Sequence, residues 1–414
     1  MASENIVIVG GGLAGATAAK TLRAEGYRGP VILLAEERHH PYLRPPLSKE
    51  YLLAMADDGA LPVVPADWYE ANGVELRLGT TVTGIDPAAR SVNLRDGQSL
   101  GYASLLLATG ARPRRIPLPG SDAEGVSTFR TVDDCRRLRA GLADGGRNVV
   151  MIGSGWIGME LAAAASAYGN SVTLLGLEEV PLAAAIGREL GGFFRSLHEA
   201  NGVRFRLPAS AAEIREQSGR VTGVVTDAGE VLPADLVILA VGVIPEVSLA
   251  EAAGIALRNG ILTDASLRTS APAIFAAGDV ANALHPFTGE HHRSEHWSNA
   301  INGGKVAARA MLGQAAVLDT VPYFYTDQFD VSMEYSGFPS LASEPPAIRG
   351  SLEGKEFLAF WQRDGRVVAG MSVNWPRSAK PQKLIKQLIS AKTPVSPAAL
   401  ADPDVPLAGL LPET

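Results

Sequence analysis

Two copies of a glycine-rich turn, each between a short apolar run and an alanine-rich stretch, constrain this sequence more than any other feature. The first turn follows the apolar run Ile6–Val9 and the second follows Val149–Ile152, with the same spacing of glycines. The glycines are Gly10, Gly12 and Gly15 in the first copy and Gly153, Gly155 and Gly158 in the second. Such a turn lets the backbone approach a pyrophosphate, and the helix that follows offers it free N–H groups. The repeat therefore predicts two βαβ units, each binding a dinucleotide.

The residues that follow each unit's second apolar run differ between the copies. In the first copy Glu36 stands just after the run Val31–Leu34, where a carboxylate accepts hydrogen bonds from a ribose. In the second copy Gly176 directly follows the run, and the acids come only at positions 178 and 179. No Lys or Arg lies between Gly176 and Gly187 to meet a 2′-phosphate. The sequence thus favours NADH at the second site and leaves NADPH open.

Two dinucleotide sites on one chain indicate a tightly bound flavin and an exchangeable nicotinamide. Two further apolar runs end in glycine, Leu105–Gly110 and Leu236–Gly242, and each is expected to mark a passage between the two nucleotide domains. Strand patterns and one amphipathic helix follow residue 321. The predicted division is an FAD-binding domain of residues 1–111 and 241–320, an NAD-binding domain of residues 112–240, and a C-terminal α+β domain of residues 321–414.

The amino-acid composition excludes several classes of function. The 414 residues carry a net charge of −7, which disfavours nucleic-acid binding, and Cys135 is the one cysteine. A single cysteine excludes a disulfide framework, a Cys-ligated iron–sulfur cluster and a C-x-x-C redox pair. Electron chemistry must therefore use a bound cofactor. No secretory signal and no apolar stretch of about 20 residues is apparent, which predicts a cytoplasmic protein without a membrane anchor.

Four segments give the chain a family resemblance. They are Pro41–Lys49, Gly153–Glu160, Ile274–Asp279 and Glu295–Asn299. With them the chain resembles the FAD-dependent ferredoxin reductases of oxygenase systems, of the putidaredoxin reductase and biphenyl dioxygenase ferredoxin reductase type, which are related to apoptosis-inducing factor. The resemblance is good over residues 5–330 and looser beyond. It implies an α/β fold of the glutathione-reductase-like, three-layer kind, with two Rossmann-like domains and a C-terminal α+β domain.

The resemblance also implies an activity and its partners. The enzyme would take a hydride from NADH onto FAD and pass single electrons to a [2Fe–2S] ferredoxin that feeds a cytochrome P450 or a Rieske-type oxygenase. It implies catalytic roles for Lys49, near the flavin N5, and for Glu160, with which Lys49 would pair. The FAD contacts it implies are Gly10, Gly12, Leu13, Ala14, Gly15, Glu36, Arg44, Lys49, Val82, Ala108, Thr109, Gly110, Arg130, Gly278, Asp279, His296 and Trp297. The nicotinamide contacts are Gly153, Gly155, Trp156, Ile157, Gly158, Glu160, Gly242 and Glu295.

The sequence departs from the family pattern at three places. Gly176 stands where the family usually has an acid, which leaves the coenzyme preference open. Tyr323 and Tyr325 occupy positions usually held by Trp, and the segment Asn374–Arg377 is unlike that of the commoner reductases. The mode of partner docking is therefore not carried over from the family.

For several of these residues the sequence also allows a purely structural role in place of the functional one. Lys49 could be a solvated loop lysine, and Glu160 could be an acid that favours the N-terminus of its helix. For the histidines the sequence favours a polar loop over a metal site; they are His285, His291, His292 and His296. The lysines opposite the apolar face of the last helix could dock an acidic ferredoxin or only be solvated; they are Lys380, Lys383 and Lys386.

Two other functions fit the same cofactors. One is an NADH oxidase or quinone reductase, which needs no protein acceptor. The other is a redox-sensing module like apoptosis-inducing factor, in which reduction changes shape or association and turnover is incidental. The oligomeric state is expected to be a monomer or a weak homodimer.

Overall fold

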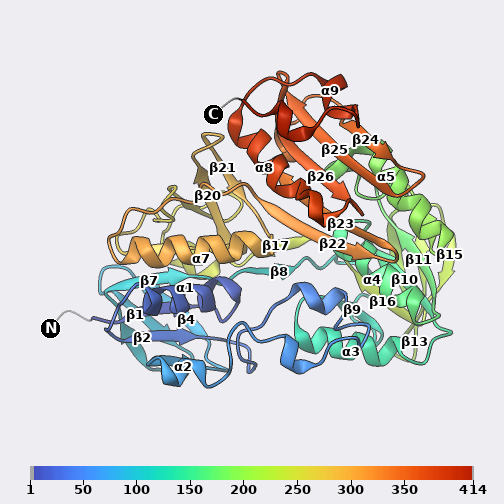
Figure 1. Cartoon of the computed structure of the whole chain (residues 1–414). Helices are drawn as coiled ribbons and strands as arrows, with labels where there is room; N and C mark the ends of the chain where they lie inside the picture. Colours follow the sequence, from blue (N-terminus) through green and yellow to red (C-terminus); the bar gives the residue numbers. More distant parts are fainter. Residues whose placement is uncertain (1–3, 413–414) are drawn as a thin grey trace. The chain divides into compact units, whose positions relative to one another are not determined.

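The computed structural model describes residues 4–412, which fold into two compact units. Unit 1 consists of the chain up to Leu43, Asp57–Arg112 and Ile244–Pro322. Unit 2 consists of Arg44–Ala56, Pro113–Val243 and the chain from Tyr323 onward. The chain passes from one unit to the other within strands β8 (Ala111–Pro113) and β17 (Val243–Pro245) (Figure 1). The three-domain division stated above stays a prediction.

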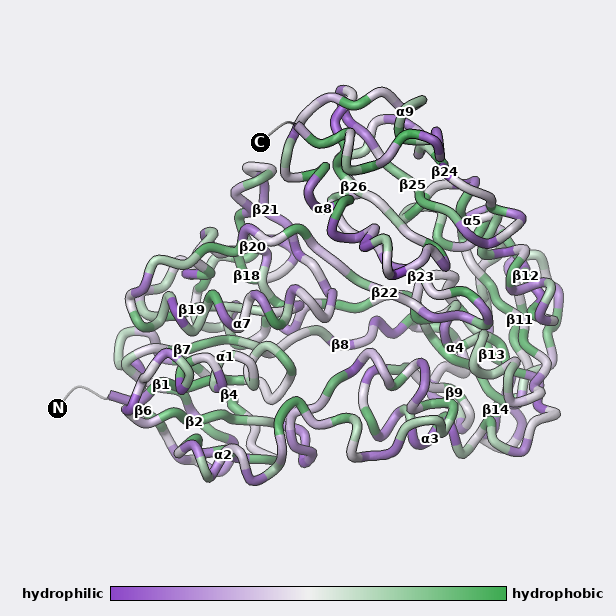
Figure 2. Tube along the Cα trace, in the orientation of Figure 1, coloured by the Kyte–Doolittle hydropathy of each residue, from purple (hydrophilic) through white to green (hydrophobic). Residues whose placement is uncertain are grey.

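Unit 1 contains a parallel sheet in the order β3–β2–β1–β7–β19. Its strands are β1 (Ile6–Val9), β2 (Val31–Leu34), β3 (Val74–Arg77), β7 (Ser104–Leu107) and β19 (Ile274–Ala276). Successive residues of β1 point to opposite faces: Ile6 and Ile8 join one apolar cluster, while Val7 and Val9 join the other. Both faces are buried at the centre of the sheet, and this explains why β1 and β2 are apolar throughout rather than alternating, whereas the edge strand β3 also carries Glu75 and Arg77 (Figure 2).

Helices cover one face of this sheet and small antiparallel sheets complete the unit. Helices α1 (Leu13–Ala24) and α7 (Trp297–Met311) pack against each other, and a Cβ on Gly304 would lie 2.5 Å from the Ala14 carbonyl oxygen. Glycine at 304 therefore allows the close approach of the two helices. The remaining elements are α2 (Trp68–Ala71), β4 (Val82–Asp86), β5 (Ser91–Leu94), β6 (Ser99–Gly101), α6 (Ser248–Ala252), β18 (Ile261–Thr263), β20 (Ala281–His285) and β21 (Glu290–Arg293).

Unit 2 contains a second five-stranded parallel sheet, in the order β12–β11–β10–β16–β9; its outer strand β9 precedes β10 in the chain, whereas the outer strand β19 of unit 1 follows β7. Its strands are β9 (Val126–Thr128), β10 (Asn148–Ile152), β11 (Ser171–Leu175), β12 (Arg204–Arg206) and β16 (Leu236–Leu239). Its helices are α3 (Val132–Leu142), α4 (Trp156–Ala167) and α5 (Ala183–Ala200). An antiparallel sheet of β13 (Ala211–Gln217), β14 (Arg220–Thr226) and β15 (Val231–Pro233) supplies apolar side chains to one face of the parallel sheet.

The C-terminal part of unit 2 is an antiparallel sheet in the order β22–β23–β26–β25–β24. The strands are β22 (Tyr323–Gln328), β23 (Val331–Gly337), β24 (Ala347–Ser351), β25 (Glu356–Arg363) and β26 (Arg366–Val373). Helix α8 (Pro381–Ala391) packs on β26 and β23, where a Cβ on Gly370 would meet the Ile385 side chain at 2.7 Å. The short helix α9 (Pro397–Ala401) contacts β24. The predicted fold class, two Rossmann-like α/β units and an α+β C-terminal part, is confirmed.

Candidate functional site

The first glycine loop, in unit 1, has the backbone that its spacing predicts. Gly10 has φ +121°, and a Cβ there would lie 2.1 Å from the Ala108 carbonyl oxygen. A Cβ on Gly15 would lie 2.2 Å from the Gly10 carbonyl oxygen. Only glycine fits at these two positions, because the loop is pressed onto the end of β7 on one side and onto α1 on the other.

The loop leaves the N-terminus of α1 open to an anion. Gly12 is the N-cap, and no side chain bonds to the free N–H groups of the first turn. Glu36 follows β2 and accepts a hydrogen bond from Thr81 Oγ1 at 3.3 Å. A free helix N-terminus suits a pyrophosphate, and a carboxylate suits a ribose. The contacts of this loop and of Glu36 with FAD stay predictions. Val82, which follows Thr81, is the first residue of β4 and is buried.

A second part of unit 1 brings an acid to the same helix. Asp279 lies in a 3-10 turn that follows β19. The residue before it, Gly278, packs closely on α1: a Cβ added to Gly278 would lie 3.0 Å from the Ala14 side chain. Asp279 thus stands beside the N-terminus of α1. His296, the residue before α7, lies near it: burial lowers the pKa of His296 to about 4, and the Asp279 charge opposes that shift. Trp297 opens α7.

Other predicted contacts of unit 1 take part in its own hydrogen bonds. Thr109 Oγ1 donates to the Glu246 carbonyl oxygen at 2.7 Å, and Gly110 has φ +71°. Glu295 pairs with Arg293, at 2.7 Å between carboxylate and guanidinium. The role of Glu295 at the nicotinamide stays a prediction.

The second glycine loop, in unit 2, reproduces the first. Gly153 has φ +114°, and its Cβ would lie 2.3 Å from the Ala240 carbonyl oxygen. A Cβ on Gly158 would lie 2.2 Å from the Gly153 carbonyl oxygen, and Gly155 is the N-cap of α4 without a side-chain cap. Gly242, beyond β16, has φ +90°. The two loops therefore offer the same backbone cradle to two dinucleotides.

The structure gives a packing reason for the glycine at 176. A Cβ there would lie 2.3 Å from Ser154 Oγ and 2.9 Å from a Leu207 methyl group. The space that an acid would need is therefore filled from the glycine loop itself. A cation that was not predicted from the sequence also lies on the neighbouring strand. Arg206 ends β12, and its guanidinium forms two hydrogen bonds with the Glu230 carboxylate (2.8 and 2.9 Å).

We expect coenzyme choice to respond to this packing. Combining Ser154→Gly with Gly176→Asp makes room for a carboxylate that accepts ribose hydroxyls and repels a 2′-phosphate. The ratio of kcat/KM for NADH over NADPH should rise at least about tenfold, as measured by coenzyme oxidation with ferricyanide as acceptor. Ser154→Gly alone is the control and should leave the ratio near the wild-type value. An unchanged ratio in a well-folded double variant would contradict the prediction.

Lys49 and Glu160 form a buried ion pair in unit 2. Lys49 follows the 3-10 helix η1 (Pro45–Ser48) and Glu160 lies on α4; the Nζ–Oε1 distance is 2.9 Å. Their side chains are 7% and 4% exposed. The alternative that Lys49 is a solvated loop lysine is therefore wrong. Glu160 is the fifth residue of α4 rather than a residue of its first turn, so the helix-terminus explanation is also wrong.

Two hydroxyl groups complete the surroundings of the Glu160 carboxylate. Ser48 Oγ donates to Oε2, and Thr326 Oγ1 donates to Oε1 at 2.6 Å. The Lys49 ammonium also lies 5.4 Å from the centre of the Tyr325 ring. Ser48 and Thr326 were not predicted from the sequence, because they lie far from Glu160 along the chain and no spacing signal links them to it.

Arg44 and Arg130 also lie together in unit 2. Arg44 Nη1 donates to the Arg130 carbonyl oxygen at 2.6 Å, and the capping residue Asp134 accepts a hydrogen bond from the Arg130 amide at 3.0 Å. The contact brings the Arg44 guanidinium to the backbone of Arg130, and a guanidinium is a group that suits a phosphate. Their contact with FAD stays a prediction.

The histidine segment is a hairpin rather than the predicted polar loop. His285 ends β20, while His291 and His292 lie on β21, which pairs antiparallel with β20. Thr288 Oγ1 lies 2.8 Å from His292 Nε2. Within residues 4–412, no three His, Cys, Asp or Glu side chains form a group that could hold a metal. In the same residues, no helix is both long and apolar enough to span a bilayer.

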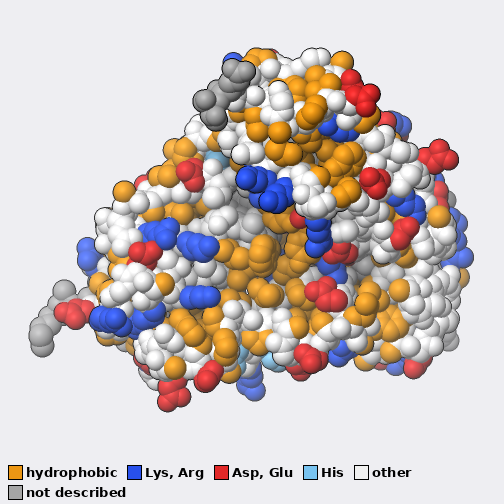
Figure 3. Space-filling model, viewed as in Figure 1, with side chains coloured by type: hydrophobic (Ala, Val, Ile, Leu, Met, Phe, Trp, Pro, Cys, Tyr) orange, Lys and Arg blue, Asp and Glu red, His pale blue; other side chains and the backbone are white. Residues whose placement is uncertain are grey.

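Of the three lysines near the C-terminus, two are exposed to solvent and one contacts a tyrosine ring. Lys380 and Lys383 are exposed, and Figure 3 shows basic side chains together over α8. Lys386 was predicted on the same solvated face, but it is half-buried with its Nζ 4.5 Å from the centre of the Tyr323 ring. Burial lowers the pKa of Lys386. The Lys386 ammonium thus lies over the face of the Tyr323 ring in a cation–π contact.

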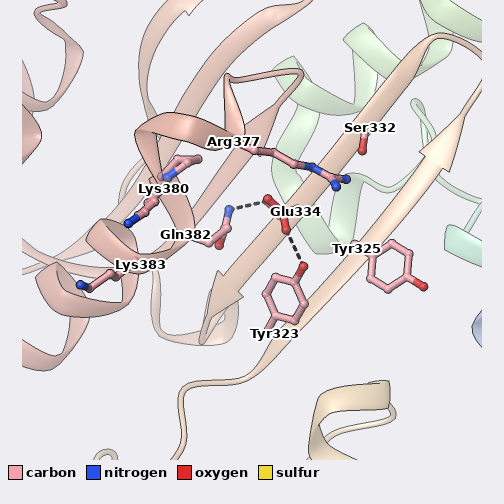
Figure 4. A pocket seen from close by; sticks show the side chains of 9 residues that line it. Tyr323, Tyr325, Ser332, Glu334, Arg377, Lys380, Gln382 and Lys383 are labelled. Atoms are coloured by element: carbon pink, nitrogen blue, oxygen red, sulfur yellow. Dashed lines mark hydrogen bonds between the residues drawn. The ribbon is translucent and has the colours of Figure 1, made fainter.

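A pocket of about 380 Å³ opens beside these lysines (Figure 4). Its lining combines three cations with two tyrosines and one acid: Arg377, Lys380, Lys383, Tyr323, Tyr325 and Glu334. The Tyr323 hydroxyl donates to Glu334 Oε1 at 2.6 Å, which occupies the one carboxylate. The pocket therefore presents net positive charge.

Comparison with known proteins agrees with this geometry. Residues 4–304 match the pyridine nucleotide-disulphide oxidoreductase family, and residues 323–411 match the reductase C-terminal family. The chain is 39% identical to the anthranilate 1,2-dioxygenase system ferredoxin–NAD(+) reductase component of Burkholderia cepacia, covering 98% of this chain and 99% of that one. A ferredoxin reductase structure for the CYP199A2 system of Rhodopseudomonas palustris superposes with a TM-score of 0.94 at 35% identity, covering 98% and 99% of the two chains. The covalent putidaredoxin reductase–putidaredoxin complex gives 0.94 at 34% identity, with 99% and 98% covered.

The chain belongs to the pyridine nucleotide-disulphide oxidoreductases, in the branch of the FAD-dependent ferredoxin reductases. The predicted resemblance and the predicted cofactors, FAD and NAD(P)H, are confirmed. The roles assigned to single residues stay predictions.

Proposed function

We propose that this protein takes a hydride from NADH and delivers electrons singly to a [2Fe–2S] ferredoxin that serves a cytochrome P450 or a Rieske-type oxygenase. One observation carries the proposal: the helix that begins at the second glycine loop also holds Glu160 in a buried ion pair with Lys49. A fixed pair of charges, shielded from water, on the coenzyme-binding helix is what hydride transfer requires of a protein. The names of the relatives support the same reading.

The residues of the chain have separate tasks in this mechanism. The loop of Gly153 to Gly158 binds the coenzyme pyrophosphate at the N-terminus of α4 and so orients the nicotinamide. Lys49, held by Glu160, offers positive charge where negative charge develops during hydride transfer. FAD supplies the chemistry, since a bound flavin accepts two electrons together and releases them one at a time.

A thiol relay has no part in this mechanism. Cys135 is the sequence's one cysteine, and its Sγ lies 3.1 Å from the Leu47 carbonyl oxygen, to which it donates. Burial raises the pKa of the Cys135 thiol to about 11, so the nucleophilic thiolate is scarce at neutral pH. Electrons therefore leave from the flavin to the acceptor directly.

The basic pocket on the C-terminal sheet suits an acidic ferredoxin. It is lined by Lys380, Lys383 and Arg377, none of which forms an ion pair with a carboxylate of residues 4–412. Complementary charge speeds the encounter between proteins. Tyr325 forms one wall of the pocket and also faces the Lys49 ammonium. The docking surface would thus lie next to the buried pair within unit 2.

Charge reversal tests this surface. The double variant Lys380→Glu with Lys383→Glu should slow reduction of a [2Fe–2S] ferredoxin about tenfold at low salt, and added salt should shrink the difference. Reduction of ferricyanide by NADH should be unchanged, because the pair of Lys49 and Glu160 is not touched. Lys20→Glu, a change at an exposed lysine of unit 1, is the matched control. Equal ferredoxin rates for the wild type and the double variant would remove this docking site.

The overall proposal is tested by following the flavin band. One equivalent of NADH, added without oxygen, should bleach it, and air should restore it slowly, whereas a [2Fe–2S] ferredoxin should restore it fast. Rapid recovery in air alone would favour an NADH oxidase. Slow recovery with every ferredoxin and quinone tried, together with a change of sedimentation on adding NADH, would favour a redox-sensing role. Sedimentation without NADH also gives the oligomeric state, which we propose to be a monomer or weak homodimer.

A further inference from the structure

We propose that Thr326, Gln328 and His198 are positioning residues for Glu160, joined to it in a chain of hydrogen bonds that runs in one direction and ends at the carboxylate oxygen that pairs with Lys49. The inference rests on the proposed function, because it explains how the charge pair used in hydride transfer is held. It assigns a task to three buried polar side chains that neither glycine loop uses.

The chain of contacts is continuous. His198 Nε2 lies 2.8 Å from Gln328 Oε1, and Gln328 Nε2 lies 3.1 Å from Thr326 Oγ1. Thr326 Oγ1 lies 2.6 Å from Glu160 Oε1, the same oxygen that lies 2.9 Å from the Lys49 ammonium. A single row of side chains therefore connects α5 to the ion pair through β22.

All of these side chains are buried. Thr326 and Gln328 are 1% exposed and His198 is 0% exposed. Because alternate residues of a strand point to the same face, Thr326 and Gln328 both point inward from β22, while Asp327 between them is exposed. Helix α4, which carries Glu160, packs against β22. Burial in this position keeps water from substituting for any link of the chain.

The chemistry of the groups fixes the direction of the hydrogen bonds. An ionised Glu160 only accepts, so the Thr326 hydroxyl must donate to it and has its lone pairs left for a donor. The Gln328 amide nitrogen is that donor, which turns its carbonyl oxygen toward His198. His198 must therefore carry its proton on Nε2.

The state of His198 agrees with this assignment. Burial lowers the pKa of His198 to about 4, so the ring is neutral at physiological pH and has one N–H group. Nδ1 is buried and has no hydrogen-bond partner in residues 4–412, as suits the nitrogen without the proton. Phe329 and Phe205 pack edge-on against the ring and hold its orientation.

The direction has a consequence for the carboxylate. Each donor in the row polarises the next, and the last one adds to the negative end at Glu160 Oε1. Ser48 holds Oε2, so the carboxylate cannot rotate away from Lys49. Removing one member of the row leaves a buried polar group unsatisfied and so costs some stability as well. The chain's effect on Lys49 is therefore measured as the rate of flavin reduction per folded, FAD-bound molecule.

The test compares Thr326→Val, which keeps the shape and removes the hydroxyl, with Thr326→Ser, which keeps the hydroxyl. In stopped flow, the limiting rate of flavin reduction per bound FAD should fall about tenfold in T326V, the effect of one hydrogen bond to a charged group, and return in T326S. The NADH concentration for half-maximal rate should stay within about twofold. T326V should have no further effect in an E160Q background, because it acts through Glu160.

A second readout does not depend on turnover. Nitrogen NMR of the FAD-bound protein, with ¹⁵N-labelled histidine, should show His198 as the Nε2–H tautomer near neutral pH. Gln328→Met, the second variant if T326V fails to fold, should remove that preference and slow flavin reduction about threefold. A His198 with its proton on Nδ1 would overturn the chain.

The kinetic outcomes distinguish failure of the positioning inference from failure of the function proposed for the ion pair. If E160Q is slow and T326V is as fast as wild type, the positioning inference is overturned and the proposed function stands. If E160Q itself reduces at the wild-type rate, the task proposed for the ion pair fails, and the positioning inference fails with it.

Discussion

Replacing Lys49 by alanine is expected to slow reduction of the bound flavin by NADH about a hundredfold, with the FAD content nearly unchanged. A rate loss of about a hundredfold is typical of removing one fixed donor from a site where negative charge develops. The FAD cradle of Gly10 to Gly15 lies in unit 1, whereas Lys49 lies in unit 2, so retention of FAD is expected. Stopped-flow absorbance of the flavin band, together with the ratio of FAD to protein, measures both quantities.

The same substitution has a cost in stability that must be measured separately. Glu160 would remain buried without its cation, which costs about 3–5 kcal/mol of unfolding free energy when one partner of a buried pair is removed. Lys49→Met with Glu160→Gln removes both charges and should recover most of that stability while staying slow. Lys20→Ala, at an exposed lysine, is the control for both measurements. A wild-type rate in K49A would refute the task proposed for Lys49.

Replacing the first glycine of either glycine loop by alanine is expected to weaken binding of one cofactor and leave binding of the other unchanged. Gly10→Ala forces a Cβ to 2.1 Å from the Ala108 carbonyl oxygen at φ +121°, so the purified protein should be nearly colourless. Gly153→Ala makes the same clash with Ala240, at 2.3 Å, in unit 2. It should keep the yellow FAD but need about tenfold to a hundredfold more NADH for half-maximal reduction.

The two alanine variants control for each other. Each places one methyl group at the matching position of a matching loop, so general damage to folding would appear in both. Gly192→Ala, on α5 and outside both loops, is a milder control, because a Cβ at that position would meet no atom within 4 Å. Full FAD content in G10A would contradict the assignment of the first loop, and unaltered NADH dependence in G153A would contradict that of the second.

The parts of this molecule that could be predicted from the sequence are those with local signals. Glycine spacing next to apolar runs predicted both nucleotide loops, since turn geometry depends on a few neighbouring residues. Alternating patterns predicted the strands of the C-terminal sheet. Residue Lys49 could be linked to Glu160 only through a family resemblance, because no local pattern joins a loop lysine to a helix acid a hundred residues away.

The rest of the site depends on packing that no local pattern contains. Thr326 and Gln328 share a strand face by their spacing, but whether that face meets solvent or α4 is decided by tertiary contacts. His198 resembles any histidine on an amphipathic helix until its partner is known. Lys386 was misassigned for the same reason: the ring of Tyr323, under its ammonium group, comes from a strand distant in sequence.

The interleaving of the two units along the chain sets the order in which the protein can be completed during synthesis. Strand β19 and helix α7, which finish the first nucleotide-binding unit, come after Ile244, so its opening strands leave the ribosome long before their last neighbours. The segment Pro113–Val243, in contrast, contains a whole parallel sheet in one stretch. Since contacts close in sequence form at a lower entropic cost, this middle segment is expected to fold first and to serve as the nucleus of the newborn chain. The parallel sheet whose strands emerge first is therefore completed after the parallel sheet of the middle segment.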